Sequence, residues 1–125
     1  TAAVHAMRDP TRGGVAAVVN EWARGGLSLA VDEAAVPLSP AVRAAAALLG
    51  IDPLYVANEG KMMLAVAPQW ADQVVQALRQ HPLGQDAAII GQVVEDGRGL
   101  AYVSTPYGVQ RLLDLPFAEQ LPRIC

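Results

Sequence analysis

The sequence predicts an α/β (α+β) domain in which helices and strands alternate along the chain and pack in two or three layers. Apolar residues recur at helical spacing in three segments, and short apolar or alternating runs lie between them. Hydrophobic residues make up 53% of the 125 residues, which is ample for a single core. We therefore expect one domain with about three helices and five strands.

Three segments carry the signals of amphipathic helices. Residues 15–22 hold apolar side chains three and four positions apart, and a glycine pair ends that helix. Residues 39–50 begin with a serine N-cap and a proline and end at a glycine. Residues 70–80 form a third apolar face before the helix-breaking stretch 81–84.

Five segments are predicted to be strands: 27–32, 62–67, 88–94, 100–103 and 109–113. Segment 27–32 alternates apolar and small or polar residues, as a half-buried strand does. Segment 62–67 is a continuous apolar run, which is typical of the centre of a sheet. Residues 95–99, Glu-Asp-Gly-Arg-Gly, predict a hairpin turn, whereas residues 52–60 show no regular pattern.

Acidic and basic residues are mixed along the chain, and the net charge is -3. A nucleic-acid-binding surface needs a basic stripe, so nucleic acid is not an expected partner. No apolar run reaches the roughly 20 residues that span a bilayer, and no signal peptide is visible, so we expect a cytoplasmic protein with no membrane partner. One cysteine and two histidines give no spacing typical of a structural metal site.

Residues 7–14, Met-Arg-Asp-Pro-Thr-Arg-Gly-Gly, carry more polar chemistry than a core requires. They precede the first helix, where free backbone N–H groups, a glycine pair and the side chains of Arg8 and Arg12 suit a bound phosphate. In the alternative interpretation, Asp9 or Thr11 caps the helix and the arginines are solvated. Both interpretations are open from the residues alone.

A second polar segment, Asn58-Glu59-Gly60-Lys61, precedes the apolar run 62–67 and holds the only lysine of the chain. A carboxylate in such a loop can act as a general base or bind Mg²⁺. The same four residues can also form an ordinary turn.

Cys125 is the only cysteine and the last residue of the chain. The proline in the tail 121–125 and the terminal position argue against burial in a core. An exposed thiol has a pKa of about 8.5, so a fraction is thiolate near neutral pH, and a nearby cation increases that fraction. Cys125 is therefore either a chemical handle or an incidental terminal residue.

Three segments taken together resemble one protein family. Residues 5–14 (His-Ala-Met-Arg-Asp-Pro-Thr-Arg-Gly-Gly), 57–61 (Ala-Asn-Glu-Gly-Lys) and 122–125 (Pro-Arg-Ile-Cys) occur in the order found in the C-terminal half of the HypE family of nickel–iron hydrogenase maturation proteins. Residues 81–84 and 112–116 are similar to that family too, so the resemblance covers essentially the whole chain. The family is part of the wider aminoimidazole ribonucleotide synthetase-like, or PurM-like, class. That class implies a mixed sheet flanked by helices in three layers, here with an extended, mobile C-terminal tail.

The resemblance implies an ATP-dependent dehydration of a carbamoyl group carried on the sulfur of Cys125, which leaves a thiocyanate. It also implies that a carbamoyltransferase, HypF, loads the sulfur, and that the cyanide passes to iron on a HypC–HypD complex. ATP is expected with Mg²⁺, bound mostly by an N-terminal domain, and no resident metal is expected.

Matching the motifs residue by residue, the resemblance implies a role for each polar segment. Cys125 is the carrier and Glu59 the base. Asn58 orients the carboxamide and Lys61 offsets developing charge, or either residue only shapes the loop. The residues expected to face the transferred phosphate are Arg8, Asp9, Thr11, Arg12, Gly13 and Gly14.

Residues 1–115 are expected to form the C-terminal domain and residues 116–125 the tail. We interpret the chain as a piece of a longer protein whose N-terminal ATP-binding domain, with its homodimer contact, lies outside it. This piece alone is then expected to be inactive and to expose apolar surface. Two alternatives stay open: a small-molecule synthetase of the same class, of the purine or selenophosphate type, which needs no terminal cysteine, and a docking module whose tail only binds a partner.

Overall fold

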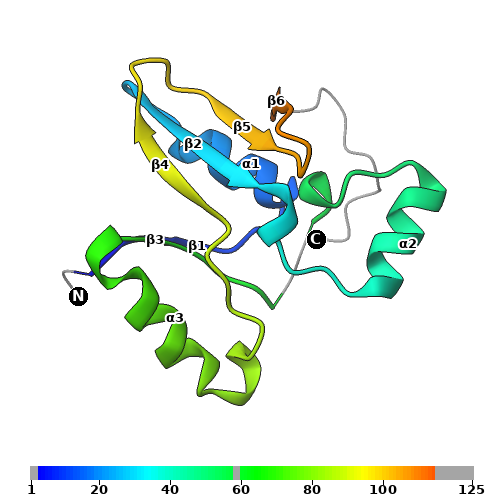
Figure 1. The fold of residues 1–125 in the computed structure, drawn as a ribbon, viewed down its shortest axis with the longest axis horizontal. Helices are drawn as coiled ribbons and strands as arrows, with labels where there is room; N and C mark the ends of the chain where they lie inside the picture. The colour runs from blue at the N-terminus through cyan, green and yellow to red at the C-terminus, as the bar shows by residue number, and fades with distance from the viewer. Residues whose placement is uncertain (1–2, 58–59, 115–125) are drawn as a thin grey trace.

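The computed structural model describes residues 3–57 and 60–114, which form six strands and three α-helices (Figure 1). The strands are β1 Val4–Arg8, β2 Leu27–Asp32, β3 Met63–Val66, β4 Gly91–Glu95, β5 Ala101–Ser104 and β6 Gln110–Leu112. The helices are α1 Gly14–Trp22, α2 Pro40–Leu49 and α3 Ala71–Arg79, and the 3₁₀ turns are η1 Glu33–Ala35, η2 Pro53–Tyr55, η3 Pro68–Trp70 and η4 Pro82–Gly84. All three predicted helices are present.

Four strands form a mixed sheet in the order β4-β2-β5-β6. Strand β2 is antiparallel to β4 and parallel to β5, and β6 is antiparallel to β5. The predicted α+β class with a mixed sheet is therefore confirmed.

The predicted hairpin between β4 and β5 is wrong, because β2 lies between these two strands. The turn 95–99 crosses the end of β2 instead of joining two paired strands. It is held there by Ser28, whose hydroxyl donates a hydrogen bond of 2.6 Å to Asp96, and by the N–H of Gly97, which donates to the carbonyl of Gly26 at 2.9 Å. A turn sequence fixes the reversal of the chain but not the strand that fills the space between its arms.

Segment 62–67 does not fill the centre of a sheet, which corrects a second prediction. Its strand β3 pairs only with β1, antiparallel, and all four of its residues are half-buried. Strand β1 is absent from the sequence prediction because Val-His-Ala-Met-Arg alternates poorly and carries two polar side chains. In the register, Arg8 lies opposite Met63, so the end of β1 meets the start of β3.

The core lies between α1 and one face of the four-stranded sheet, as Figure 1 shows. Val19 of α1 packs against apolar residues of β2 and β5, together with Leu54 of η2 and Leu113. In contrast, α2 and α3 lie away from this sheet (Figure 1). No helix within the described residues is long and apolar enough to cross a membrane.

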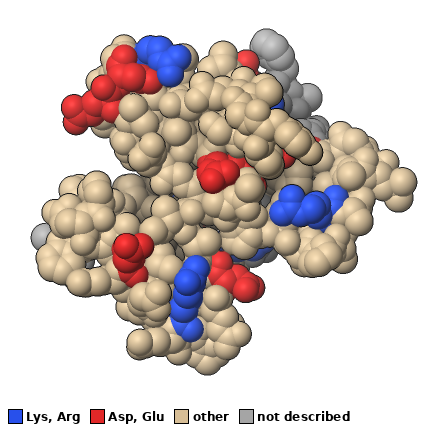
Figure 2. Space-filling view, in the orientation of Figure 1, with Lys and Arg blue, Asp and Glu red and all other residues tan. Residues whose placement is uncertain are grey.

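Several large apolar side chains are exposed, among them Leu48, Leu83 and Tyr107, which are 87%, 92% and 93% exposed. On the face drawn in Figure 2, acidic and basic residues form small separate patches, and most of the surface is neither. These three apolar side chains lie on α2, on η4 and in the turn between β5 and β6.

Candidate functional site

The first polar segment leaves β1 at Arg8 and reaches α1 through the buried Pro10. Gly13, with φ of 72°, is the N-cap residue of α1, and no side chain caps the helix. Thr11 instead donates a hydrogen bond of 2.8 Å to the carboxylate of Asp9. The alternative that Asp9 or Thr11 caps α1 is therefore wrong, and the first N–H groups of the helix carry no side-chain acceptor from the described residues.

The hydrogen bond from Thr11 holds the pKa of the Asp9 carboxyl below its ordinary value, with help from backbone N–H donation and from Arg8. Asp9 is therefore ionised at neutral pH. An anion at the start of α1 would lie near the negative charge of this carboxylate. The positive charges of the two arginines of the segment are therefore needed to offset the repulsion between them.

Gly14 brings α1 into close contact with η2. A Cβ atom at this position would lie 2.4 Å from the carbonyl oxygen of Val56 and 2.7 Å from that of Leu54, and the φ angle is 66°. A glycine is thus required for the packing of the helix on the turn. The close approach that Gly14 permits is to the chain's own backbone.

The two arginines of the segment have different surroundings. Arg8 forms an ion pair with Glu21, near the end of α1. Arg12 is exposed and forms no ion pair with another described residue. Within the described chain, Arg12 is therefore the arginine of this segment that is not engaged by a carboxylate, whereas Arg8 would first have to leave Glu21 to contact an anion.

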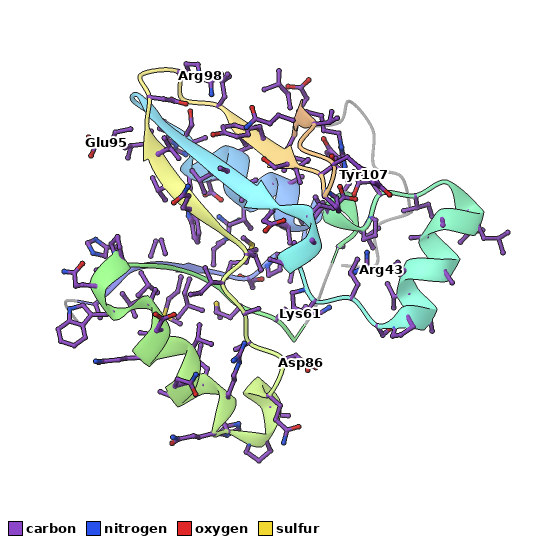
Figure 3. The ribbon with its side chains drawn as sticks, viewed as in Figure 1. Arg43, Lys61, Asp86, Glu95, Arg98 and Tyr107 are labelled. Carbon is purple, nitrogen blue, oxygen red and sulfur yellow. The ribbon has the colours of Figure 1, made fainter. Side chains whose placement is uncertain are left out.

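The second polar segment follows η2 and Val56, whose carbonyl touches Gly14. Lys61 is exposed and precedes β3, as Figure 3 shows. Arg8 lies opposite Met63 in the ladder, and η2 packs on the start of α1. The first polar segment and the described residues of the second, Gly60 and Lys61, therefore lie at the same end of the β1–β3 ladder. The structure thus brings together two segments that are about fifty residues apart in the sequence.

Asn58, Glu59 and Cys125 lie outside the described residues, so their predicted roles stay predictions. Among the residues that the structure does describe, no group of three or more His, Cys, Asp or Glu side chains is placed to hold a metal ion. The free helix N-terminus, Arg12 and the nearby Lys61 make up the part of the site that can attract an anion.

Nothing in the sequence signals the contacts that join the last described residues to η2 and α1. Arg111 of β6 forms an ion pair of 2.8 Å with Asp52, the N-cap of η2. Asn20 of α1 donates hydrogen bonds to the carbonyls of Ala16 and of Leu113. The Asp-Pro pair before η2 signals a capped turn, but no local pattern pairs it with an arginine some sixty residues later.

Comparisons with known proteins agree with this geometry. Residues 1–104 match the family model for AIR synthase related protein, C-terminal domain. The chain is 55% identical over 123 residues to carbamoyl dehydratase HypE of Escherichia coli (strain K12) and 50% identical over 123 residues to carbamoyl dehydratase HypE of Cupriavidus necator. In each case 98% of this chain is aligned.

Solved structures give the same result. A crystal structure of E. coli HypE, a hydrogenase maturation protein, matches with a TM-score of 0.90 and 52% identity over 98% of this chain and 38% of that chain. A HypE–HypF complex matches with a TM-score of 0.85 and 37% identity, covering 91% of this chain and 37% of that one. A HypE structure in complex with ATP matches with a TM-score of 0.85 and 40% identity, covering 98% of this chain and 38% of that one.

This chain spans only 35% to 36% of the length of those two curated relatives. The similarity therefore extends along nearly all of this chain and along about a third of each relative. The resemblance expected from the three motifs is confirmed.

Proposed function

The chain belongs to the family of AIR synthase related C-terminal domains, and we propose that it is the C-terminal domain of an ATP-dependent carbamoyl dehydratase that serves hydrogenase maturation. The observation that supports the proposal is the meeting of the first polar segment with Gly60 and Lys61, which follow Glu59 in the sequence, at one end of the β1–β3 ladder. A reaction that needs both an anion site and a base requires such a meeting.

The proposed reaction converts an S-carbamoyl group on Cys125 into a thiocyanate. The amide oxygen is a poor leaving group, so transfer of a phosphoryl group from ATP to that oxygen lets it depart as phosphate. Two N–H protons are lost, and the carbon–nitrogen bond becomes a nitrile. The products are the thiocyanate, ADP and phosphate, which balances the removal of one water.

The residues of this chain have distinct proposed roles. The start of α1 and Arg12 would bind the phosphate that is transferred, since the helix has no capping side chain and its N–H groups favour an anion. Glu59 would take the N–H protons, Asn58 would orient the carboxamide, and Lys61 would offset negative charge. Gly14 would keep the loop that precedes Asn58 in contact with α1.

The cofactor and partners follow from the same proposal. ATP would bind with Mg²⁺, mostly through an N-terminal domain outside this chain, and the structure of a relative with ATP supports the nucleotide. The carbamoyltransferase HypF would load Cys125, which the HypE–HypF complex of another relative supports. The HypC–HypD iron scaffold, a homodimer formed through the N-terminal domain and a cytoplasmic location complete the proposal.

The proposal is tested by intact mass measurement on the full-length protein that contains this chain. It is incubated with the carbamoyltransferase and its carbamoyl donor, with and without ATP, beside a Cys125→Ala variant. Cys125 should gain one carbamoyl group, which should lose one water only when ATP is present. Cys125→Ala should gain nothing.

Two results would contradict the proposal. If the mass never changes while ATP is consumed, a small-molecule synthetase of the same class becomes the better interpretation. If Cys125→Ser supports hydrogenase maturation as well as the wild type does, the tail acts only in docking.

Glu59→Gln should give the carbamoylated protein without dehydration, which separates the loading step from the later one.

A further inference from the structure

Helix α2 is poorly supported by the rest of the described chain. Nine of its ten residues are exposed, and only Ala46 is half-buried. Isolated helices shorter than about 12–15 residues are marginal in water, even when they are rich in alanine. Its Ser39 N-cap and Gly50 C-cap help, but a helix of this length normally needs a packing partner.

A groove runs along one side of α2. It has a volume of about 430 Å³ and is walled on the helix side by Arg43, Ala46, Ala47 and Gly50. These positions are three or four residues apart and therefore share one face of the helix. The opposite wall is formed by η2 and by Arg111 of β6.

The lining of the groove is largely apolar, and its charged members are Arg43, Arg111 and the carboxylates of Glu33 and Asp52. Leu38, Ile51 and Leu54 contribute apolar surface, and the two alanines leave room for a large side chain. Figure 3 shows Arg43 projecting from α2 toward the rest of the molecule. Arg43 forms no ion pair with another described residue, whereas Arg111 is already paired with Asp52.

The described chain ends beside this groove. Arg111 lines it, Leu113 is fixed in the core at 1% exposure, and the Leu113 carbonyl accepts a hydrogen bond from Asn20. Leu113 belongs to the same core cluster as Leu54, and Tyr55 packs against that cluster, so the last described residues lie close to η2.

The eleven residues that follow Asp114 have the composition that the groove requires. They read Leu-Pro-Phe-Ala-Glu-Gln-Leu-Pro-Arg-Ile-Cys and contain the only phenylalanine of the chain, Phe117. Three residues of extended chain reach about 10 Å, so Phe117 can enter a groove that begins at Arg111. Glu119 follows two residues later and has the charge that complements Arg43.

We propose that the groove between α2 and η2 is the docking site of the chain's own tail, with Phe117 seated against Ala46 and Ala47 and Glu119 near Arg43. Cys125 lies eight residues beyond Phe117 and stays outside the groove. The docked tail supplies the packing that α2 lacks. This inference goes beyond the proposed reaction and does not depend on it.

The test is hydrogen exchange of the α2 backbone amides in the 125-residue chain. Phe117→Asp should speed exchange in α2 by about tenfold or more, because a buried aromatic side chain is lost from the groove. Ala118→Asp adds the same charge one residue later and should have a much smaller effect. Exchange in β2 and β5 should be unchanged in both variants, which shows that the core is folded.

The groove side is tested by a matched pair within α2. Ala47→Glu places a charge in the groove and should speed exchange as Phe117→Asp does, whereas Ala44→Glu, on a part of the helix that does not line the groove, should not. The double variant Phe117→Asp/Ala47→Glu should exchange no faster than either single one, since both break the same contact.

Two outcomes would overturn the docking proposal. In the first, α2 exchanges at the wild-type rate in Phe117→Asp. In the second, Phe117→Asp changes exchange in α2 only at protein concentrations where the chain self-associates, because a second copy and not the tail then covers the groove. Neither outcome bears on the dehydration of Cys125, which is measured separately by mass.

Discussion

At the scale of single residues, Gly14 holds the start of α1 against the turn that precedes the second polar segment, and this can be tested by substitution. Gly14→Ala should destabilise the fold twice over, through the positive φ angle and through contact with the Val56 carbonyl. Gly25→Ala is the matched control, because its φ is also positive, at 55°, but a Cβ atom there would meet nothing within 4 Å. We expect about 1–2 kcal/mol for Gly25→Ala and about 1–3 kcal/mol more for Gly14→Ala. Equal losses in urea denaturation would show that the contact is unimportant.

The pair Ser28 and Asp96 gives a prediction for pH. Ser28 is fully buried, and its hydroxyl donates to Asp96 while it accepts a hydrogen bond of 2.9 Å from the N–H of Leu100. The bond from Ser28, together with N–H donation from Arg98, lowers the pKa of Asp96 from 3.8 to about 2. A lowered pKa in the folded state favours the ionised form, so its contribution to stability is complete above pH 3.8 and is lost as the pH falls toward 2.

Asp96→Asn should therefore be less stable than the wild type at neutral pH, and the difference should shrink below pH 3.8. Urea midpoints of both proteins, measured from pH 7 downward, give the comparison. A difference that stays constant down to pH 2 would mean that the carboxylate charge is not what stabilises the turn.

At the scale of elements, the end of the described chain is held to the core by one of the two leucines at and just after the end of β6. Leu113, just after β6, is 1% exposed, whereas Leu112 is 50% exposed. Leu113→Ala should cost about 2–5 kcal/mol, as is usual for a buried leucine. Leu112→Ala removes the same atoms from the surface and should cost less than about 1 kcal/mol. Thermal or urea unfolding distinguishes the two, and similar losses would mean that β6 is anchored by its ladder with β5.

Elements whose ends are marked by nearby residues could be predicted from the sequence, whereas the order in which the strands pair could not. Ser39 and Gly50 mark both ends of α2, and the structure uses them as caps. In contrast, the turn 95–99 predicted a hairpin, although β2 lies between its arms. The hydrogen bond between Ser28 and Asp96 that holds this turn joins residues 68 positions apart, and no short-range pattern contains it.

At the scale of the whole molecule, the same limit applies to the candidate site. The polar residues of segments 7–14 and 58–61 are recognisable from their chemistry, and both segments resemble motifs of the same protein family. Their meeting depends on the register of β1 with β3 and on the contact of Gly14 with Val56, which are long-range facts. The ion pair of Arg8 with Glu21 is of the same kind, and it changes which arginine is available to an anion.

The exposed apolar surface predicts how the chain associates with itself in solution. Leu48 and Leu83, at 87% and 92% exposure, lie on α2 and η4, and the chain spans about a third of its curated relatives. We expect weak self-association, seen as an average mass in sedimentation that rises with protein concentration. The net charge of -3 opposes association only slightly. Added salt should therefore not weaken an association through apolar side chains, whereas it would weaken an association through charged groups by screening them.

Single lysine substitutions identify the surface responsible for this association. Leu48→Lys and Leu83→Lys each place a charge on one exposed apolar region without touching the core. At least one of them should lower the average mass at high concentration, and in the full-length protein neither substitution should change the average mass, because the rest of that protein then covers the same surface. A monomer at every concentration would mean that the exposed side chains are too scattered to form a contact, and salt-sensitive association would assign it to charge.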